Sequence, residues 1–208
     1  MKPVRLAILG LGTVGGGALK LLQENAAEIK RRTGREIQIT HVGTRRPRPD
    51  LELEGIQQSA DLMEIVRQPN VDVVVEVMGG IHPAYEVIME AIKHGKQVVT
   101  ANKALLAEHG NELFKAAEDN AVQIAYEAAV AGGIPIIKVI REGLAANRIE
   151  WLAGIINGTG NFILTEMRDK GRAFTDVLAE AQQLGYAEAD PTFDVEGILS
   201  LIHISDGA

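Results

Sequence analysis

Short apolar runs alternate with longer amphipathic segments over the first 126 residues. Each run ends at a glycine or a polar residue, as is typical of buried strands, and the segments between them space their apolar residues as helices do. The pattern predicts strands at residues 4–9, 36–42, 72–77, 97–100 and 122–126, and helices at residues 12–31, 83–94 and 104–120. Strands alternating with helices of this length predict an α/β protein with a doubly wound parallel sheet.

The pattern changes after residue 127. Residues 128–137 are small, apolar and glycine-rich, as is common where a chain passes between domains. We therefore expect one domain over residues 1–127 and the start of a second, α+β domain over residues 128–198. Within the second domain the pattern predicts a helix at 134–145, a strand at 149–156, a turn at 157–161, and helices at 162–170 and 174–184.

Composition narrows the class of protein. The apolar share of 46% suffices for a core, and no apolar run is long enough for a membrane span. The amino terminus lacks the features of a signal peptide, so we expect a cytoplasmic protein with no membrane partner. The chain has no cysteine, which excludes disulfides and a thiol nucleophile, and its net charge of −7 argues against binding to nucleic acid.

A glycine motif, Gly-Leu-Gly-Thr-Val-Gly, lies between the first predicted strand and the first predicted helix. In this context G-x-G-x-x-G indicates dinucleotide binding: Gly10 permits the turn, Gly12 lets a pyrophosphate approach the backbone, and Gly15 lets the helix pack closely. The helix N-terminus supplies N–H groups for the phosphates. A glycine-rich turn without a ligand is the alternative. The expected cofactor contacts are Gly10, Gly12, Thr13, Val14 and Gly15.

The residues after the second predicted strand bear on which dinucleotide binds. NAD sites usually place an acid there, whereas this chain has Gly-Thr-Arg-Arg-Pro-Arg over residues 43–48. Guanidinium groups suit the 2′-phosphate of NADP, so we predict NADP(H), with Arg45 as the contact, and keep NAD(H) as possible. The alternative is a solvated basic loop.

Thr100 and Lys103 come at the carboxyl end of the strand predicted at 97–100, an edge that faces the ligand crevice in open parallel sheets. Lys103 could lie by the nicotinamide and stabilise negative charge on a substrate oxygen. Equally, Asn102 could cap the following helix and leave Lys103 solvated. The spacing leaves both interpretations open.

Five segments together resemble the homoserine dehydrogenase family: GLGTVG at 10–15, VVTANKALLAEHG at 98–110, YEAAVAGGIPII at 126–137, INGTGNFIL at 156–164 and GYAEADPTFDVEG at 185–197. The resemblance covers residues 4–198. It implies a Rossmann-type domain followed by a substrate and dimerisation domain, in a homodimer. It also implies NAD(P)-dependent interconversion of L-homoserine and L-aspartate 4-semialdehyde, on the route to threonine, methionine and isoleucine.

The resemblance implies particular site residues. Lys103 lies by the cofactor and substrate. A monovalent cation, usually sodium, is held by Glu127, Val130, Gly132 and Ile134, and carbonyl oxygens with one carboxylate do suit a hard cation. The alternative there is a glycine-rich hinge with an exposed Glu127. The homoserine pocket is expected at Thr159, Gly185, Glu188 and Asp194.

The acidic residues of the substrate motif also make sense chemically, because homoserine carries an ammonium group that an acidic loop can bind. Without the cofactor motif, a solvated acidic turn would be the simpler interpretation. Two other functions stay open: a related amino-acid-pathway oxidoreductase, and a non-catalytic NADP-binding fragment.

The chain departs from the family pattern after Ile198. The family continues with Asp at 199 and, at 203, a Lys that is the expected proton donor, whereas this chain has Leu199 and His203. Residues 199–208 match the in-frame translation of a transposon-end adapter used for sequencing libraries, followed by primer sequence. We expect this tail to be non-native and the chain as written to be an inactive truncation.

Overall fold

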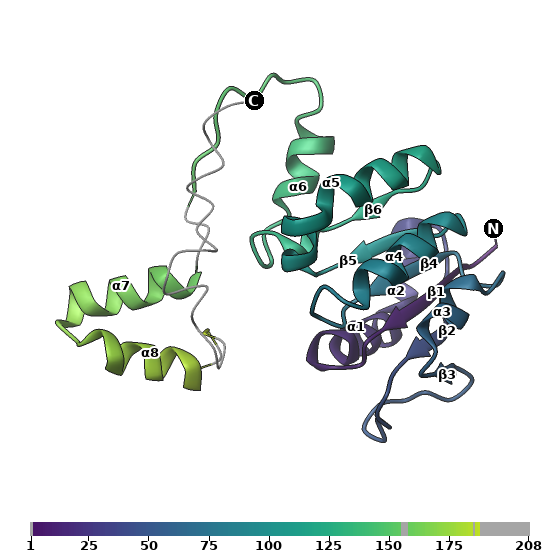
Figure 1. Ribbon diagram of the computed structural model, residues 1–208, viewed down its shortest axis with the longest axis horizontal. Helices are drawn as coiled ribbons and strands as arrows, with labels where there is room; N and C mark the ends of the chain where they lie inside the picture. Colours follow the sequence, from purple (N-terminus) through teal and green to yellow (C-terminus); the bar gives the residue numbers. More distant parts are fainter. Residues whose placement is uncertain (1, 155–157, 185, 188–208) are drawn as a thin grey trace. The chain divides into compact units, whose positions relative to one another are not determined.

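The computed structural model describes residues 2–154, 158–184 and 186–187. It divides the chain into two compact units, residues 1–145 and residues 146–208. The first unit contains a six-stranded sheet in the order β3-β2-β1-β4-β5-β6, and every neighbouring pair is parallel (Figure 1). The strands are β1 (Val4–Leu9), β2 (Ile37–Gly43), β3 (Gln57–Ser59), β4 (Val73–Glu76), β5 (Gln97–Thr100) and β6 (Ile124–Ala125).

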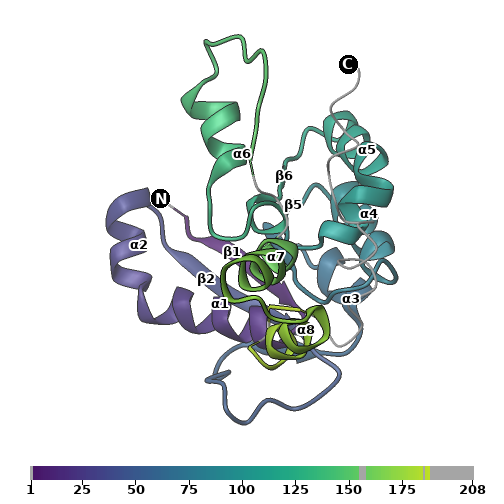
Figure 2. The same cartoon turned by 90° about the vertical axis from the view of Figure 1, so that its left-hand side faces the viewer.

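Helices cover both faces of this sheet (Figure 2). One face carries α1 (Thr13–Glu24) and α2 (Ala26–Thr33), and the other carries α3 (Leu62–Arg67), α4 (Ala84–Lys93) and α5 (Lys103–Asp119). The chain changes direction across the sheet between β1 and β4, and ligands of such sheets bind at the carboxyl ends of the strands at this switch point. The predicted doubly wound α/β fold is therefore confirmed.

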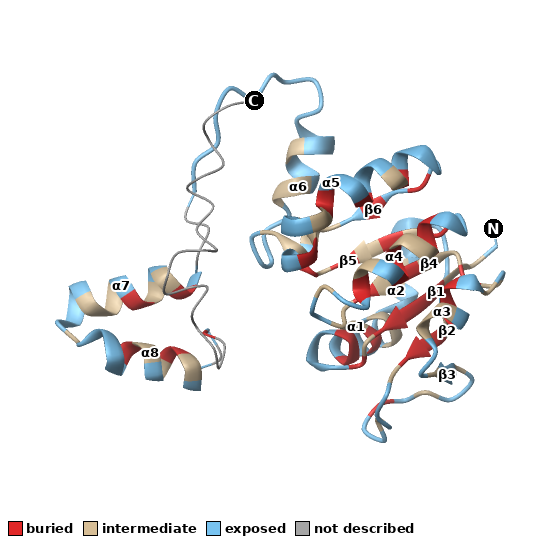
Figure 3. Ribbon diagram, viewed as in Figure 1, coloured by how far each residue is buried: buried red, intermediate tan, exposed pale blue. Residues whose placement is uncertain are grey.

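Each face of the sheet has its own apolar core. The α1 face buries Ile8, Leu19 and Val42, and the opposite face buries a larger set that includes Leu9 and Ile92. The buried residues follow the strands and the inner sides of the helices (Figure 3). Strands buried on both faces explain the continuous apolar runs in the sequence.

The five strands predicted before residue 127 are confirmed to within a residue or two at each end. The helix predicted at residues 12–31 is instead two helices, because Asn25 interrupts it. The Asn25 backbone N–H and side-chain Nδ2 both donate to the carbonyl of Leu21, at 3.1 and 2.9 Å, and so end α1. Asn25 is then the N-cap of α2. The sequence pattern gave no element for β3 or α3.

A connecting segment follows β6. It contains η1 (Glu127–Ala129), α6 (Ile136–Lys138) and the π-helical η2 (Val139–Gly143), so the predicted helix at 134–145 is present but shorter. The predicted strand at 149–156 is wrong over 149–154, since no strand forms there. A strand needs a hydrogen-bonded neighbour, and this stretch is exposed, with Trp151 at 79%. Residues 155–156 lie outside the described residues.

The second unit contains α7 (Gly158–Lys170) and α8 (Phe174–Gln183), which confirm the two predicted helices. They pack through Ile163, Val177 and Ala181. The turn predicted at 157–161 is wrong from residue 158 onward, because α7 already begins at Gly158. The packing that buries Thr159 here overrides the weak helix propensity of these residues. Within the described ranges, no helix has the length and apolar character needed to cross a bilayer.

Candidate functional site

The glycine turn joins β1 to α1 and leaves no room for side chains at two of its positions. Gly10 has φ +98°, and a Cβ there would lie 2.8 Å from the carbonyl oxygen of Val77. A Cβ on Gly15 would overlap the carbonyl oxygen of Gly10. At Gly12, by contrast, a Cβ would meet no atom within 4 Å. The space above Gly12 is therefore open, which fits the close approach of a pyrophosphate to the backbone.

The N-terminus of α1 adds electrostatic attraction for an anion. Gly12 is the N-cap, no side chain caps the helix, and its first turn contains no acidic residue. Thr13 and Val14 are exposed, Val14 at 58%. The first N–H groups of the helix and the positive end of its dipole thus face a space that a phosphate can enter. The residues present fit a dinucleotide.

A hollow of about 240 Å³ lies where β2 and β3 end. Arg45 and Arg46 are exposed here, and within the described residues neither forms an ion pair. The hollow therefore offers unpaired positive charge after β2, the strand that pairs with β1, as recognition of a 2′-phosphate requires. The lining residues are Thr44, Arg45, Arg46, Pro47, Gln58, Ser59 and Ala60.

Arg48, from the same basic loop, behaves differently. Its guanidinium donates to the two carboxylate oxygens of Asp50 at 2.8 and 2.7 Å, and this holds the pKa of Asp50 down at about 2. Nη1 also lies 3.4 Å from the carbonyl oxygen of Gly12. Arg48 therefore packs against the glycine turn with its charge already paired. The sequence favoured Arg45 as the cofactor contact but did not indicate that Arg48 pairs with Asp50.

A buried carboxylate lies at the carboxyl end of β4. Glu76 is 0% exposed. Its Oε1 accepts the backbone N–H of Met78 at 2.8 Å, and its Oε2 accepts the hydroxyl of Thr100 at 2.7 Å. The Thr100 oxygen in turn accepts the N–H of Asn102 at 3.0 Å. Thr100, expected at the cofactor, is thus fully buried and engaged within the protein.

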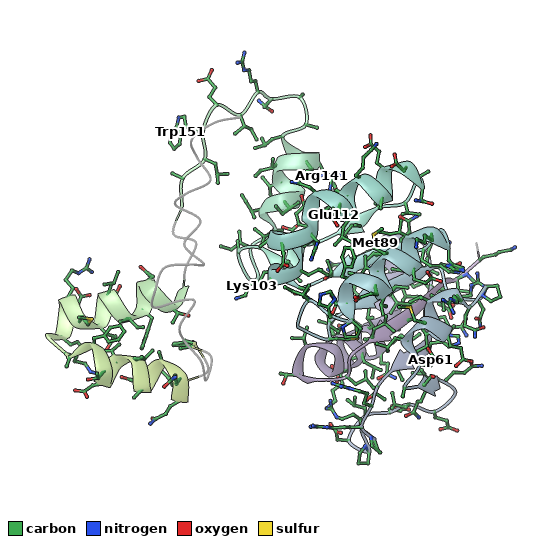
Figure 4. The ribbon with its side chains drawn as sticks, viewed as in Figure 1. Asp61, Met89, Lys103, Glu112, Arg141 and Trp151 are labelled. Carbon is green, nitrogen blue, oxygen red and sulfur yellow. The ribbon has the colours of Figure 1, made fainter. Side chains whose placement is uncertain are left out.

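Asn102 caps the following helix, as one of the two interpretations of this segment expected. Asn102 Oδ1 accepts the N–H of Leu105 at 3.1 Å and so caps α5, while its Nδ2 donates to the carbonyl of Gly80 at 2.5 Å. Lys103 is the first residue of α5, and its side chain is exposed at the carboxyl edge of the sheet (Figure 4). Asn102 therefore caps α5 and leaves Lys103 exposed, and a role for Lys103 at a cofactor stays a prediction.

The sequence did not predict that Glu76 is buried near the candidate site. The available signal was an acid within a run of valines, three residues before the pair Gly79 and Gly80. Apolar periodicity places such a residue inside the strand predicted at 72–77 but gives no sign that its side chain is buried.

Glu127 is bound to the backbone of α6. Its Oε1 accepts the N–H of Ile137 and its Oε2 that of Lys138, both at 2.9 Å. The intervening loop turns through Ala131 and Gly132, which have φ +54° and +60°. Val130 and Ile134 lie on this same loop, and each makes a local backbone hydrogen bond.

Acidic and histidine side chains do not gather into a metal site in the part of the chain that the structure describes. A cation at the Glu127 loop would therefore rely on backbone carbonyl oxygens and the one carboxylate.

In the second unit, two of the predicted substrate motifs meet. Thr159 is buried, and its hydroxyl donates to the carbonyl of Tyr186 at 2.5 Å. The rings of Phe162 and Tyr186 lie edge to face, with centroids 5.1 Å apart. The N-terminus of α7 is thereby fixed to the segment after α8. Gly185, Glu188, Asp194 and His203, with the whole of 199–208, lie outside the described residues.

Comparison with protein families gives two matches. The family described as "Homoserine dehydrogenase, NAD binding domain" matches residues 10–127, and the family described as "Homoserine dehydrogenase" matches residues 135–202. The first match spans more than half of the chain and contains the glycine turn, the basic loop and Lys103.

Curated relatives and solved structures agree with these matches. A homoserine dehydrogenase of Pseudomonas aeruginosa is 62% identical over 198 residues, covering 95% of this chain and 46% of the relative. A crystal structure of a homoserine dehydrogenase from Thiobacillus denitrificans has a TM-score of 0.88 at 59% identity, covering 96% of this chain and 47% of that one.

A hyperthermophilic archaeal homoserine dehydrogenase, solved in complex with NADPH, has a TM-score of 0.80 at 29% identity, covering 96% of this chain and 66% of that one. This chain spans about half the length of the curated relatives it matches.

Proposed function

This chain belongs to the homoserine dehydrogenase family, and we propose that it supplies the cofactor domain and the start of the substrate domain of an enzyme that interconverts L-homoserine and L-aspartate 4-semialdehyde. The observation that carries the proposal is the open space above Gly12 at the switch point of the sheet, within a chain that matches the family along most of its length.

NADP(H) is the preferred cofactor in this proposal, with NAD(H) as the weaker ligand. Arg45 and Arg46 support the preference, because their unpaired charges line the hollow that follows β2, the strand paired with β1. The archaeal relative described as a complex with NADPH supports it as well. Arg45 is proposed to contact the 2′-phosphate, and the glycine turn with the start of α1 to contact the pyrophosphate.

When bound, the nicotinamide supplies the hydride for reduction of the aldehyde. The Lys103 ammonium, exposed at the same edge of the sheet, stabilises negative charge on the substrate oxygen. Thr159, Gly185, Glu188 and Asp194 form the proposed substrate pocket, whose carboxylates bind the substrate ammonium. His203 occupies the position where the family pattern places its proton-donating lysine.

We further propose that a sodium ion binds at the loop containing Glu127, Val130, Gly132 and Ile134. The anchoring of the Glu127 carboxylate and the sharp turn at Gly132 support this assignment. In this proposal the whole enzyme is a cytoplasmic homodimer, and residues 199–208 are not native. Resequencing the 3′ end of the gene from source DNA tests the last point, and recovery of the same ten codons would refute it.

The central experiment has two parts. The chain is titrated with NADPH and with NADH by cofactor fluorescence, and the protein encoded by the resequenced gene is assayed for homoserine-dependent reduction of NADP⁺. We expect tighter binding of NADPH and turnover with homoserine. Turnover only with a different amino-acid substrate would favour a related oxidoreductase, and cofactor binding without any turnover would favour a non-catalytic binding protein.

A further inference from the structure

We propose that Glu76 is a positioning residue for the cofactor site. Its buried carboxylate holds the loop after β4 against the glycine turn, and through Thr100 it also holds the start of α5, which carries Lys103. The inference rests on the proposed function, because it assumes that the carboxyl edge of β1, β4 and β5 receives the dinucleotide.

The hydrogen bonds around Glu76, together with the backbone from Met78 to Gly80, form a closed ring. On one side the carboxylate accepts the N–H of Met78, in the loop after β4. On the other side it accepts the hydroxyl of Thr100, which accepts the N–H of Asn102. The Asn102 side chain then donates to the carbonyl of Gly80, two residues beyond Met78. Two loops from neighbouring strands are thereby tied to each other as well as to the carboxylate.

The ring also reaches the glycine turn. Leu9, Glu76 and Thr100 occupy the same register position on β1, β4 and β5. Gly10, directly after Leu9, packs so closely on the next loop that a Cβ would lie 2.9 Å from the Cα of Met78. Met78, which Glu76 holds through a hydrogen bond, therefore packs directly against the glycine turn. A shift of Met78 would change the shape of that turn.

A carboxylate at this position is costly for stability alone. The rest of β4 is valine, and burying a carboxylate among apolar residues is unfavourable unless strong hydrogen bonds compensate. Each carboxylate oxygen of Glu76 accepts one hydrogen bond, one from the loop after β4 and the other from Thr100 at the end of β5. Gly79 and Gly80 have φ +77° and +76° and contribute no side chains. The loop therefore depends on the ring for its position, and a preformed site loses less entropy when ligand binds.

The test measures NADPH affinity by fluorescence titration of the 208-residue chain and its variants, well below their unfolding temperatures. Glu76→Gln keeps the size of the side chain but offers a single acceptor oxygen. Thr100→Val removes the hydroxyl, and Thr100→Ser restores it. Glu118→Gln is the matched control, since Glu118 is an exposed residue of α5.

We expect Glu76→Gln and Thr100→Val each to raise the Kd for NADPH about tenfold, because each leaves a buried donor or acceptor without its partner. Thr100→Ser and Glu118→Gln should stay within about twofold of the unmodified chain. Because both weakening changes break the same ring, the double variant should bind about as weakly as either single one.

The outcomes separate the two proposals. A purely structural role would lower the unfolding temperature of Glu76→Gln and leave its Kd for NADPH unchanged, which would overturn the inference while leaving the proposed function intact. If Thr100→Ser failed to restore the affinity lost in Thr100→Val, the hydroxyl link would be wrong. If the unmodified chain bound neither NADPH nor NADH, the proposed function would fail and this inference with it.

Discussion

The glycines of the turn are needed for different physical reasons. Gly15 faces the carbonyl of Gly10, so a side chain there conflicts with the fold itself. Gly12 conflicts with nothing in the protein, and its φ of −71° suits any residue. Folding therefore places no steric demand on Gly12, and the proposed role of this position in ligand binding can be tested separately from folding.

We expect Gly12→Ala to fold normally and to lose most of its affinity for NADPH, because the new methyl group occupies the space of the pyrophosphate. Gly15→Ala should be strongly destabilised. Gly17→Ala is the matched control: it lies in α1 with no atom near its Cβ, and should stabilise the chain by about 1 kcal/mol without changing affinity. Circular dichroism melting and fluorescence titration measure both effects. Tight NADPH binding by Gly12→Ala would contradict the assignment.

A substitution of Arg45 tests the preference between NADPH and NADH. Arg45→Ala should raise the Kd for NADPH about tenfold and leave the Kd for NADH nearly unchanged, because only NADPH carries the 2′-phosphate. Arg32→Ala, an exposed arginine of α2 paired with Glu28, serves as the control. Equal losses for both cofactors would place Arg45 at a part of the dinucleotide that NADH shares.

Among the elements, the sequence pattern predicted well wherever apolar periodicity was strong. The buried strands and the long helices α4 and α5 were found nearly to the residue. β3 was missed because Gln57, Gln58 and Ser59 are polar and carry no alternation. The single long helix was wrong because Asn25, an ordinary helical residue by periodicity, forms local hydrogen bonds to the carbonyl of Leu21.

The pairing of β1 with β4 gives a prediction about pH. Arg5 donates to both oxygens of Asp72 at the amino end of these strands, and the guanidinium lowers the pKa of Asp72 to about 2. Since the folded pKa lies below the ordinary value, the pair stabilises the fold fully above about pH 4, and that stability is lost as the pH falls towards 2.

Urea unfolding at a series of pH values measures this contribution. Asp72→Asn should lose less stability than the unmodified chain between about pH 5 and pH 2, and should be less stable near neutrality. Asp119→Asn, which breaks an exposed pair with Lys115, is the control and should keep the original pH dependence. Identical slopes for Asp72→Asn and the unmodified chain would show that the pair does not couple folding to protons.

For the whole molecule, the sequence predicted the site's motifs better than its interior. The glycine turn, the basic loop and Lys103 follow β1, β2 and β5, and they lie at the same edge of the sheet because all of its strands run parallel. The pattern did not reveal the Glu76 ring or the pairing of Arg48 with Asp50. Both depend on which side chains meet across the fold, and one-dimensional spacing does not contain that information.

The first unit should be sufficient for cofactor binding. The sheet and both of its cores lie within residues 1–145, as do the glycine turn, the Arg45 hollow and the Glu76 ring. A fragment of residues 1–145 should therefore unfold cooperatively and bind NADPH with the Kd of the 208-residue chain.

Isothermal titration of both proteins makes this comparison, and a fragment carrying Gly12→Ala controls for nonspecific binding. A folded fragment that binds much more weakly than the longer chain would show that residues after 145 contribute directly to the cofactor site. Equal affinities would instead show that residues after 145 are not needed for cofactor binding and would favour a role for them in substrate binding. This agrees with the family matches, since the NAD binding domain match ends at residue 127 and a separate match covers residues 135–202.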